Sequence, residues 1–165
     1  MPPEPSVIVT GPNLLVADMP WPVEEPTGPN PPDGAIINYY LRQPAPGSVS
    51  LEIEDAQGRT VRRYSSTDTA VPIPPPASAP VPLYWYRAPQ TLSAAAGMHR
   101  FVWDLHHEKP LSATHEYPIT AVPGDTPRYP LGPSVVPGRY TVRLTTGGRS
   151  HTAPLVVTLD PRVKA

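Results

Sequence analysis

The sequence has no cysteine and no long run of apolar residues, and each absence excludes a class of protein. Without cysteine the chain cannot form a disulfide framework, a zinc ribbon or a thiol nucleophile. No window reaches the ~18 consecutive apolar residues of a transmembrane helix, so we predict no membrane span. Charged residues are scarce as well, at 16%, while hydrophobic residues reach 39%. This balance excludes highly charged disorder.

The sequence also lacks an excess of charge of either sign. Its 13 basic and 14 acidic residues give a formal net charge of -1 at pH 7. Without a cluster of lysine and arginine there is no electrostatic surface for nucleic acid or for an anionic membrane. Glycine-rich nucleotide-binding motifs of the P-loop or dinucleotide type are missing too. We therefore expect neutral partners, no nucleic acid and no cofactor.

Proline, by contrast, is abundant, with 28 in 165 residues beside 11 glycines. Proline interrupts helices and central strands, so this composition excludes a helical bundle. The prolines gather in 1–33, 65–82 and 106–137. We interpret 1–33 as an extended strap or linker and Pro72–Pro76 as polyproline II within a long loop.

Between these stretches, apolar and polar residues alternate as they do in half-buried antiparallel strands. Turn residues at 55–58 and at Gly147-Gly148 predict two hairpins. A turn of helix could form only at 92–97. Strands are predicted at 34–41, 49–55, 59–64, 99–105, 136–145 and 150–159, with shorter β-like runs at 7–9 and 14–17.

Roughly seven short strands with turns between them predict an all-β fold, a two-sheet antiparallel β-sandwich with long proline-rich loops. We place this domain at 34–162, after the strap at 1–33. The alternating apolar positions give the predicted core: Ile37, Tyr39, Leu51, Ile53, Val61, Phe101, Trp103, Tyr140, Val142, Leu144, Leu155 and Val157.

Four segments, in this order, resemble a known module: 30–41, 49–63, 97–105 and 137–144. They resemble the C-terminal domain of bacterial secreted BNR-repeat proteins, the sialidase-like or sortilin-like β-propellers often labelled glycosyl hydrolases. That domain is similar to the immunoglobulin-like domain of the flagellar hook-capping protein. Its hallmarks are a hairpin with D-x-x-G, a W-D strand and a P-G-x-Y-x-V strand. The resemblance covers about residues 20–162.

The resemblance implies an immunoglobulin-like accessory domain of a larger exported protein, secreted or periplasmic. Its partner would be a β-propeller, and the domain would mediate packing or an interaction with protein or glycan. The propeller that would carry catalytic residues is not in this sequence, so we expect no enzymatic activity here. The first residues also lack the basic and apolar regions of a signal peptide. We expect the chain to be a piece of a longer protein.

Aromatic residues in the proline-rich loops support a second hypothesis, an autonomous carbohydrate-binding module. Rings carried on loops of a rigid scaffold can stack on pyranose faces without needing charge. The alternative, which we favour, is that the rings bury their large area by packing on the sandwich or on proline rings. The candidate ligand-binding residues are Trp21, Tyr84, Trp85, Tyr86, Tyr117 and Tyr129.

Histidines in the last proline-rich stretch support a third hypothesis, a small metalloenzyme. His106, His107 and His115, each near a glutamate, are the residue types that bind zinc. Their spacing fits no established metal motif. In a continued strand, the adjacent His106 and His107 would also point to opposite faces. We favour a solvated polar loop.

Four acidic residues have structural interpretations. Glu52 and Glu54 share one strand face, whereas a glycosidase needs carboxyls about 5–10 Å apart across a cleft with one pKa raised by burial. We therefore expect a charged outer face. Asp55 and Asp104 are expected to accept backbone hydrogen bonds in turns. No G-x-S-x-G nucleophile motif is present.

Overall fold

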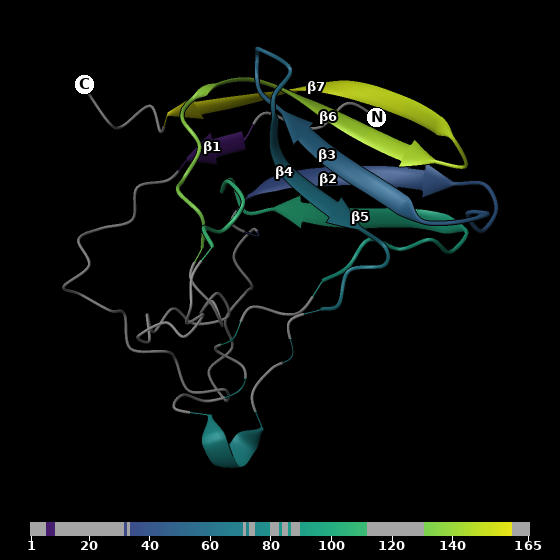
Figure 1. Ribbon diagram of the computed structural model, residues 1–165, viewed down its shortest axis with the longest axis horizontal. Coiled ribbons are helices and arrows are strands. Elements are labelled where there is room, and N and C mark those ends of the chain that lie inside the picture. The colour runs from purple at the N-terminus through teal and green to yellow at the C-terminus, as the bar shows by residue number, and fades with distance from the viewer. Residues whose placement is uncertain are drawn as a thin grey trace, which may run out of the picture.

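The structure is a computed structural model that describes residues 6–8, 32, 34–70, 72, 75–79, 83, 86, 90–111 and 131–159. This part of the chain is all-β, as predicted, and Figure 1 shows its strands in two layers. The only helical element described is a single 3-10 turn, η1, at Pro76–Ser78. The strands are β1 (Ser6–Ile8), β2 (Ala35–Leu41), β3 (Val49–Glu54), β4 (Thr60–Ser65), β5 (Gly97–Trp103), β6 (Gly138–Thr146) and β7 (Arg149–Leu159).

The strands form one five-stranded and one two-stranded sheet. The larger sheet has the order β1-β7-β6-β3-β4, and the smaller sheet pairs β2 with β5. Strands β2 to β7 pair in antiparallel fashion, whereas β1 runs parallel to β7. The larger sheet therefore extends into the segment predicted as a strap.

Both sheets bury alternate residues on the faces that meet. In β3, Val49, Leu51 and Ile53 are fully buried, because period-two side chains on one face point into the core. Two ring pairs join the layers: Tyr64 with Phe101, at a centroid distance of 4.6 Å, and Trp103 with Tyr140, at 5.7 Å. The buried core contains every predicted residue except Leu144, which is half-buried and packs against it.

The predicted turns have the expected chemistry. Asp55 Oδ1 accepts hydrogen bonds from the amides of Gln57 and Arg59, both at 2.9 Å, which confirms its structural role. These backbone bonds, the one from Arg59 most of all, lower the pKa of Asp55. The β6–β7 hairpin turns at Gly147 and Gly148, whose φ angles of 54° and 74° lie in the left-handed region that glycine tolerates.

Two local predictions have different outcomes. The possible helical turn at 92–97 does not form: this segment is irregular and runs into β5. The prediction of polyproline II over Pro72–Pro76 is wrong at Pro76, which begins η1, whereas Pro75, with φ -56° and ψ 145°, is in the polyproline II region. Residues 73 and 74 lie outside the described part. None of the described segments forms a helix of the length and apolarity needed to cross a bilayer.

Candidate functional site

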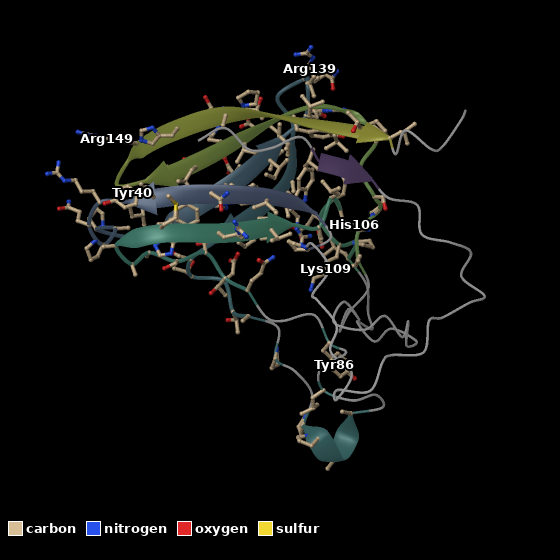
Figure 2. All side chains as sticks on the ribbon, turned by 180° about the vertical axis from the view of Figure 1, so that it is seen from behind. Tyr40, Tyr86, His106, Lys109, Arg139 and Arg149 are labelled. Carbon is tan, nitrogen blue, oxygen red and sulfur yellow. The ribbon has the colours of Figure 1, made fainter. Side chains whose placement is uncertain are left out.

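Most of the candidate ligand-binding aromatics lie outside the described residues. Only Tyr86 is described, and its side chain is buried, with 7% of its surface exposed. Figure 2 shows it well apart from the two sheets, and the core that the sheets share does not include it. The role of Tyr86 therefore stays a prediction. The residues outside the described part are Trp21, Tyr84, Trp85, Tyr117 and Tyr129.

The described polar side chains that converge most closely lie where β5 ends. We call this site the histidine corner and define it as residues 103–108 and 132–135 together with Arg62 of β4. Figure 2 shows His106 beyond the end of the two-stranded sheet. The corner links the two sheets, because β5 belongs to the smaller sheet and β4 to the larger.

Leu105 gives the corner its shape. Its φ of 58° is left-handed, a conformation that costs a non-glycine residue roughly 1–2 kcal/mol. Two features stabilise this backbone conformation. The Leu105 side chain is buried, and the Leu105 carbonyl accepts a hydrogen bond from the amide of Val135 at 2.8 Å. β5 ends at Trp103, just before this reversal, so the strand predicted at 99–105 stops earlier than expected, and His106 and His107 do not continue it. No local pattern signals this reversal, because leucine rarely adopts it.

His106 is held at both ring nitrogens. Its Nδ1 lies 2.6 Å from the carbonyl of Asp104, and its Nε2 lies 3.2 Å from Ser134 Oγ. A carbonyl can only accept, so Nδ1 donates, which leaves Nε2 of a neutral ring to accept from the serine hydroxyl. The backbone of His106 is fixed too, since its carbonyl accepts from the indole of Trp103 and its amide donates to the Asp104 carboxylate.

His107 and Glu108 fasten the corner to the edge of the larger sheet. The amide of His107 donates to the carbonyl of Pro133, and the amide of Glu108 donates to the carbonyl of Val61. Arg62 Nη1 donates to the His107 carbonyl at 3.2 Å and to Glu108 Oε1 at 2.9 Å. The side chain of His107 itself is exposed.

Arg62 is mostly buried because it lies on the core side of β4, directly opposite the buried Ile53. The register shifts just beyond this pair, between Ile53 and Glu54. Its guanidinium lies 5.1 Å from the centre of the Tyr64 ring. Burial raises the pKa of the Tyr64 hydroxyl, and the Asp104 carboxylate adds to that shift. Nothing in the sequence pattern of 59–64 reveals an inward arginine.

Gly132 allows the two loop segments of the histidine corner, 103–108 and 132–135, to approach each other closely. A Cβ at this position would lie 2.2 Å from the His107 carbonyl oxygen and 2.6 Å from that of Glu108. Both neighbours are backbone atoms, so a larger residue would have to displace the strand-like segment at 107–108. Neither Gly132 nor Ser134 stands out in the sequence, because each becomes informative only once 103–108 and 132–135 are paired.

The described residues contain no group of three histidine, aspartate or glutamate side chains arranged to hold a metal ion. His106 uses both ring nitrogens in hydrogen bonds. No described contact brings the His107 side chain to the His106 ring. The third predicted ligand, His115, lies outside the described residues. The metal hypothesis therefore stays a prediction.

The Ser134–His106–Asp104 arrangement has the residue types of a hydrolase triad, and its geometry decides what it can do. His106 Nε2 could take the Ser134 proton, but Nδ1 binds the backbone of Asp104 and lies 3.9 Å from that carboxylate. His106 and Ser134 are also directly opposite each other in an isolated antiparallel bridge. Their hydrogen bond therefore follows from main-chain pairing and fixes the corner.

Glu52 and Glu54 lie on the outer face of β3, and both pair with arginines. Glu54 accepts two hydrogen bonds from Arg143 of β6, at 2.8 and 3.0 Å. Glu52 lies 3.6 Å from Arg63 of β4. The carboxylates therefore connect three strands across the sheet surface, as a charged outer face would.

The Glu54–Arg143 pair predicts a pH-dependent stability. Hydrogen bonding by Arg143 is the main cause that lowers the pKa of Glu54 below its ordinary 4.5. Because the folded-state pKa is the lower one, the pair stabilises the fold above pH 4.5, and this contribution is lost as the pH falls through the lowered value. We expect the melting temperature of Glu54→Gln to fall less steeply than that of the wild type below pH 4.5.

Thermal melts followed by circular dichroism in matched buffers would measure this difference. Asp55 is present in both proteins, so its own acid titration cancels. Glu52→Gln is the matched control, because its nearest arginine atom is more distant, and its melting curve should stay closer to the wild type. Parallel curves for the wild type and Glu54→Gln would contradict the prediction.

No protein-family model matches this chain, and no curated protein or solved structure matches it either.

Proposed function

We propose that this chain is a non-catalytic, immunoglobulin-like accessory domain of an exported bacterial β-propeller protein. In this proposal it packs against the propeller or presents a surface to protein or glycan. The proposal starts from the resemblance of four sequence segments to such domains. It is supported by what the hallmark residues of those segments do in the fold.

The observation that carries the proposal is the hydrogen bond of Tyr140. The tyrosine of the P-G-x-Y-x-V segment donates its hydroxyl to the carbonyl of Val136, four residues upstream, at 2.6 Å. A tyrosine that closes a loop onto its own strand in this way is typical of immunoglobulin-like sandwiches. Its ring also packs on Trp103, the tryptophan of the W-D segment. Two hallmarks that are far apart in the sequence thus share one structural contact.

The remaining hallmark is structural as well. Asp55 and Gly58 of the D-x-x-G hairpin form the turn itself, since the amide of Gly58 donates to the Asp55 carbonyl and the Asp55 carboxylate caps the following amides. Asp104 of the W-D segment binds the amide of His106. These motif residues have structural partners, which suits a domain whose role is mechanical or adhesive.

The length and the cellular location of the native polypeptide in the source cells test the proposal. An antibody raised against this chain should detect, after cell fractionation, a polypeptide much longer than 165 residues in the extracytoplasmic fraction or the medium. Mild proteolysis should release a stable fragment close to the length of this chain, because compact domains resist cleavage better than their linkers.

A cytoplasmic marker and a periplasmic marker, probed on the same blot, control for the fractionation. A polypeptide of only this length in the cytoplasmic fraction would contradict the proposal. Mass spectrometry of the detected polypeptide identifies the neighbouring domain. A neighbour other than a β-propeller would overturn the proposal that this domain accompanies a propeller.

A further inference from the structure

The free edge of β2 differs from the other sheet edges. Nothing among the described residues pairs with β2 on the side away from β5. Proteins usually protect such edges with charges, prolines, bulges or covering segments, since an open edge can pair with another chain. Within β2, whose sequence is AIINYYL, all residues are described, and none is charged or a proline.

The edges of β4, β5 and β7 carry recognisable protection, and β1, the outermost strand on the other side of the larger sheet, has only three residues. β4 has its bulge, the charged Arg63 and the Glu108 amide bound at Val61. On β5, the Gln90 carboxamide covers the edge by accepting from the amide of Val102 and donating to its carbonyl. β7 is covered in part by the short β1, and Pro154 interrupts the rest. β2 lacks these protecting features, so its edge is open to pairing with another strand.

The bonds of Gln90 reveal which groups β2 presents. Because the amide and carbonyl of Val102 point away from β2, Val102 and its partner Ile36 form a non-hydrogen-bonded pair. The amide and carbonyl of Ile36 must then point to the open edge. Such pairs alternate along an antiparallel ladder, so Asn38 and Tyr40 point their backbone groups outward as well.

The order of residues in β2 suits pairing with itself. If two copies pair in antiparallel fashion about Asn38, then Ile36 faces Tyr40 of the partner copy on the outer surface. Ile37 likewise faces Tyr39 on the core side. Pairs of a β-branched with an aromatic residue are among the favourable cross-strand pairs. Tyr40 is 63% exposed on the outer surface, and Figure 2 shows it at the opposite end of the sheet from His106.

We propose that two copies of this chain form a symmetric dimer by pairing their β2 edges in antiparallel fashion about Asn38. The two small sheets then join into one sheet with the order β5-β2-β2-β5. Asn38 exchanges both backbone hydrogen bonds with Asn38 of the other copy, and Ile36 does so with Tyr40. No residue of β2 is charged, and each copy carries Arg100 of β5 bonded to its Asn38.

Sedimentation velocity over a range of about 5 to 500 µM tests the proposal, since an interface of one strand per copy is small. The wild type should shift with concentration from the mass of one chain to twice that mass. Asn38→Pro is the main variant. It removes an amide that points outward, so the backbone bonds to β5 are kept while pairing with a second copy is blocked. Within one copy it also removes the bond that Asn38 Oδ1 accepts from Arg100 Nε at 3.2 Å. We expect its dissociation constant to rise by about tenfold or more.

Asn38→Lys is the second variant, because it places two lysines directly opposite each other at the dimer axis. The new lysine also lies opposite Arg100 of its own β5, so this variant is compared with the wild type only where it is shown to be folded. Met98→Lys is the matched control: Met98 is 71% exposed on the same outer face but lies on β5, and this variant should dimerise like the wild type. Circular dichroism melts check that each variant is folded. Amide hydrogen exchange tests the wild type without any mutation. The amides of Ile36, Asn38 and Tyr40 should exchange faster on dilution, because dilution dissociates the dimer that protects them.

A wild type that stays monomeric over the whole range would overturn the proposal. So would a dimer that persists in folded Asn38→Pro and Asn38→Lys. Protection of the Ile36, Asn38 and Tyr40 amides that does not change with dilution would also overturn it, because a segment of the same chain would then cover the edge.

Discussion

Trp103→Ala is expected to lose a large part of the stability of the fold. The indole of Trp103 is completely buried, and it contacts the ring of Tyr140 in the opposite sheet. Replacing a buried tryptophan by alanine leaves a large cavity and costs about 3–5 kcal/mol. Domains have only about 5–15 kcal/mol of net stability. Urea denaturation followed by far-ultraviolet circular dichroism measures the loss directly.

Two further variants separate the causes. Trp103→Phe keeps an aromatic ring but removes the indole N–H that donates to the His106 carbonyl at 3.0 Å, so we expect a smaller loss of roughly 1–3 kcal/mol. Met98→Ala, on the exposed face of the same strand, should change the free energy of unfolding by no more than about 0.5 kcal/mol. If Trp103→Ala unfolds at the wild-type urea concentration, the central role of this ring is refuted.

Gly34→Ala should have the second-largest effect, although it adds only one methyl group. Gly34 has a φ of 137°, which L-residues rarely adopt. The added Cβ would lie 2.2 Å from the Trp103 carbonyl oxygen and 2.9 Å from Val102 Cγ1. Backbone strain and overpacking together should cost roughly 2–5 kcal/mol. The same urea titration measures this loss.

Two other glycines serve as controls for this experiment. Gly47→Ala places its Cβ in open space, so its stability should stay within about 1 kcal/mol of the wild type. Gly58→Ala also has open space but a φ of 75°, so it should show the cost of strain without that of overlap. Equal stabilities for Gly34→Ala and Gly47→Ala would show that the start of β2 is not tightly packed against β5.

The sequence pattern was sufficient to locate strands β2 to β7 and many of the residues that they bury, although it missed Ala35, Leu41 and Val49. Alternation in β3 and β6 reflects burial on one face only, so Leu51, Ile53 and Val142 could be assigned to the core without knowing their partners. The turns at Asp55 and Gly147 were also predictable, because their residue types carry local hydrogen-bonding and backbone preferences.

The histidine corner could not be predicted in the same way. Its shape depends on the left-handed Leu105, on the inward Arg62 and on pairing between segments more than twenty residues apart, such as His106 with Ser134. Each of these comes from tertiary packing, which overrides the local preference of the residue. The parallel pairing of β1 with β7 is likewise set by contacts that link the two ends of the described chain.

The parallel pairing of β1 and β7 has a mechanical consequence. Ser6 lies beside Val157 and Ile8 beside Leu159, so the chain enters β1 at one end of the pair and leaves β7 at the other. A stretching force applied through the chain on both sides therefore acts along these strands in opposite directions. It loads the bonds of the ladder together, in shear, instead of opening them one after another. A domain anchored in this way is suited to resist tension applied through its two ends.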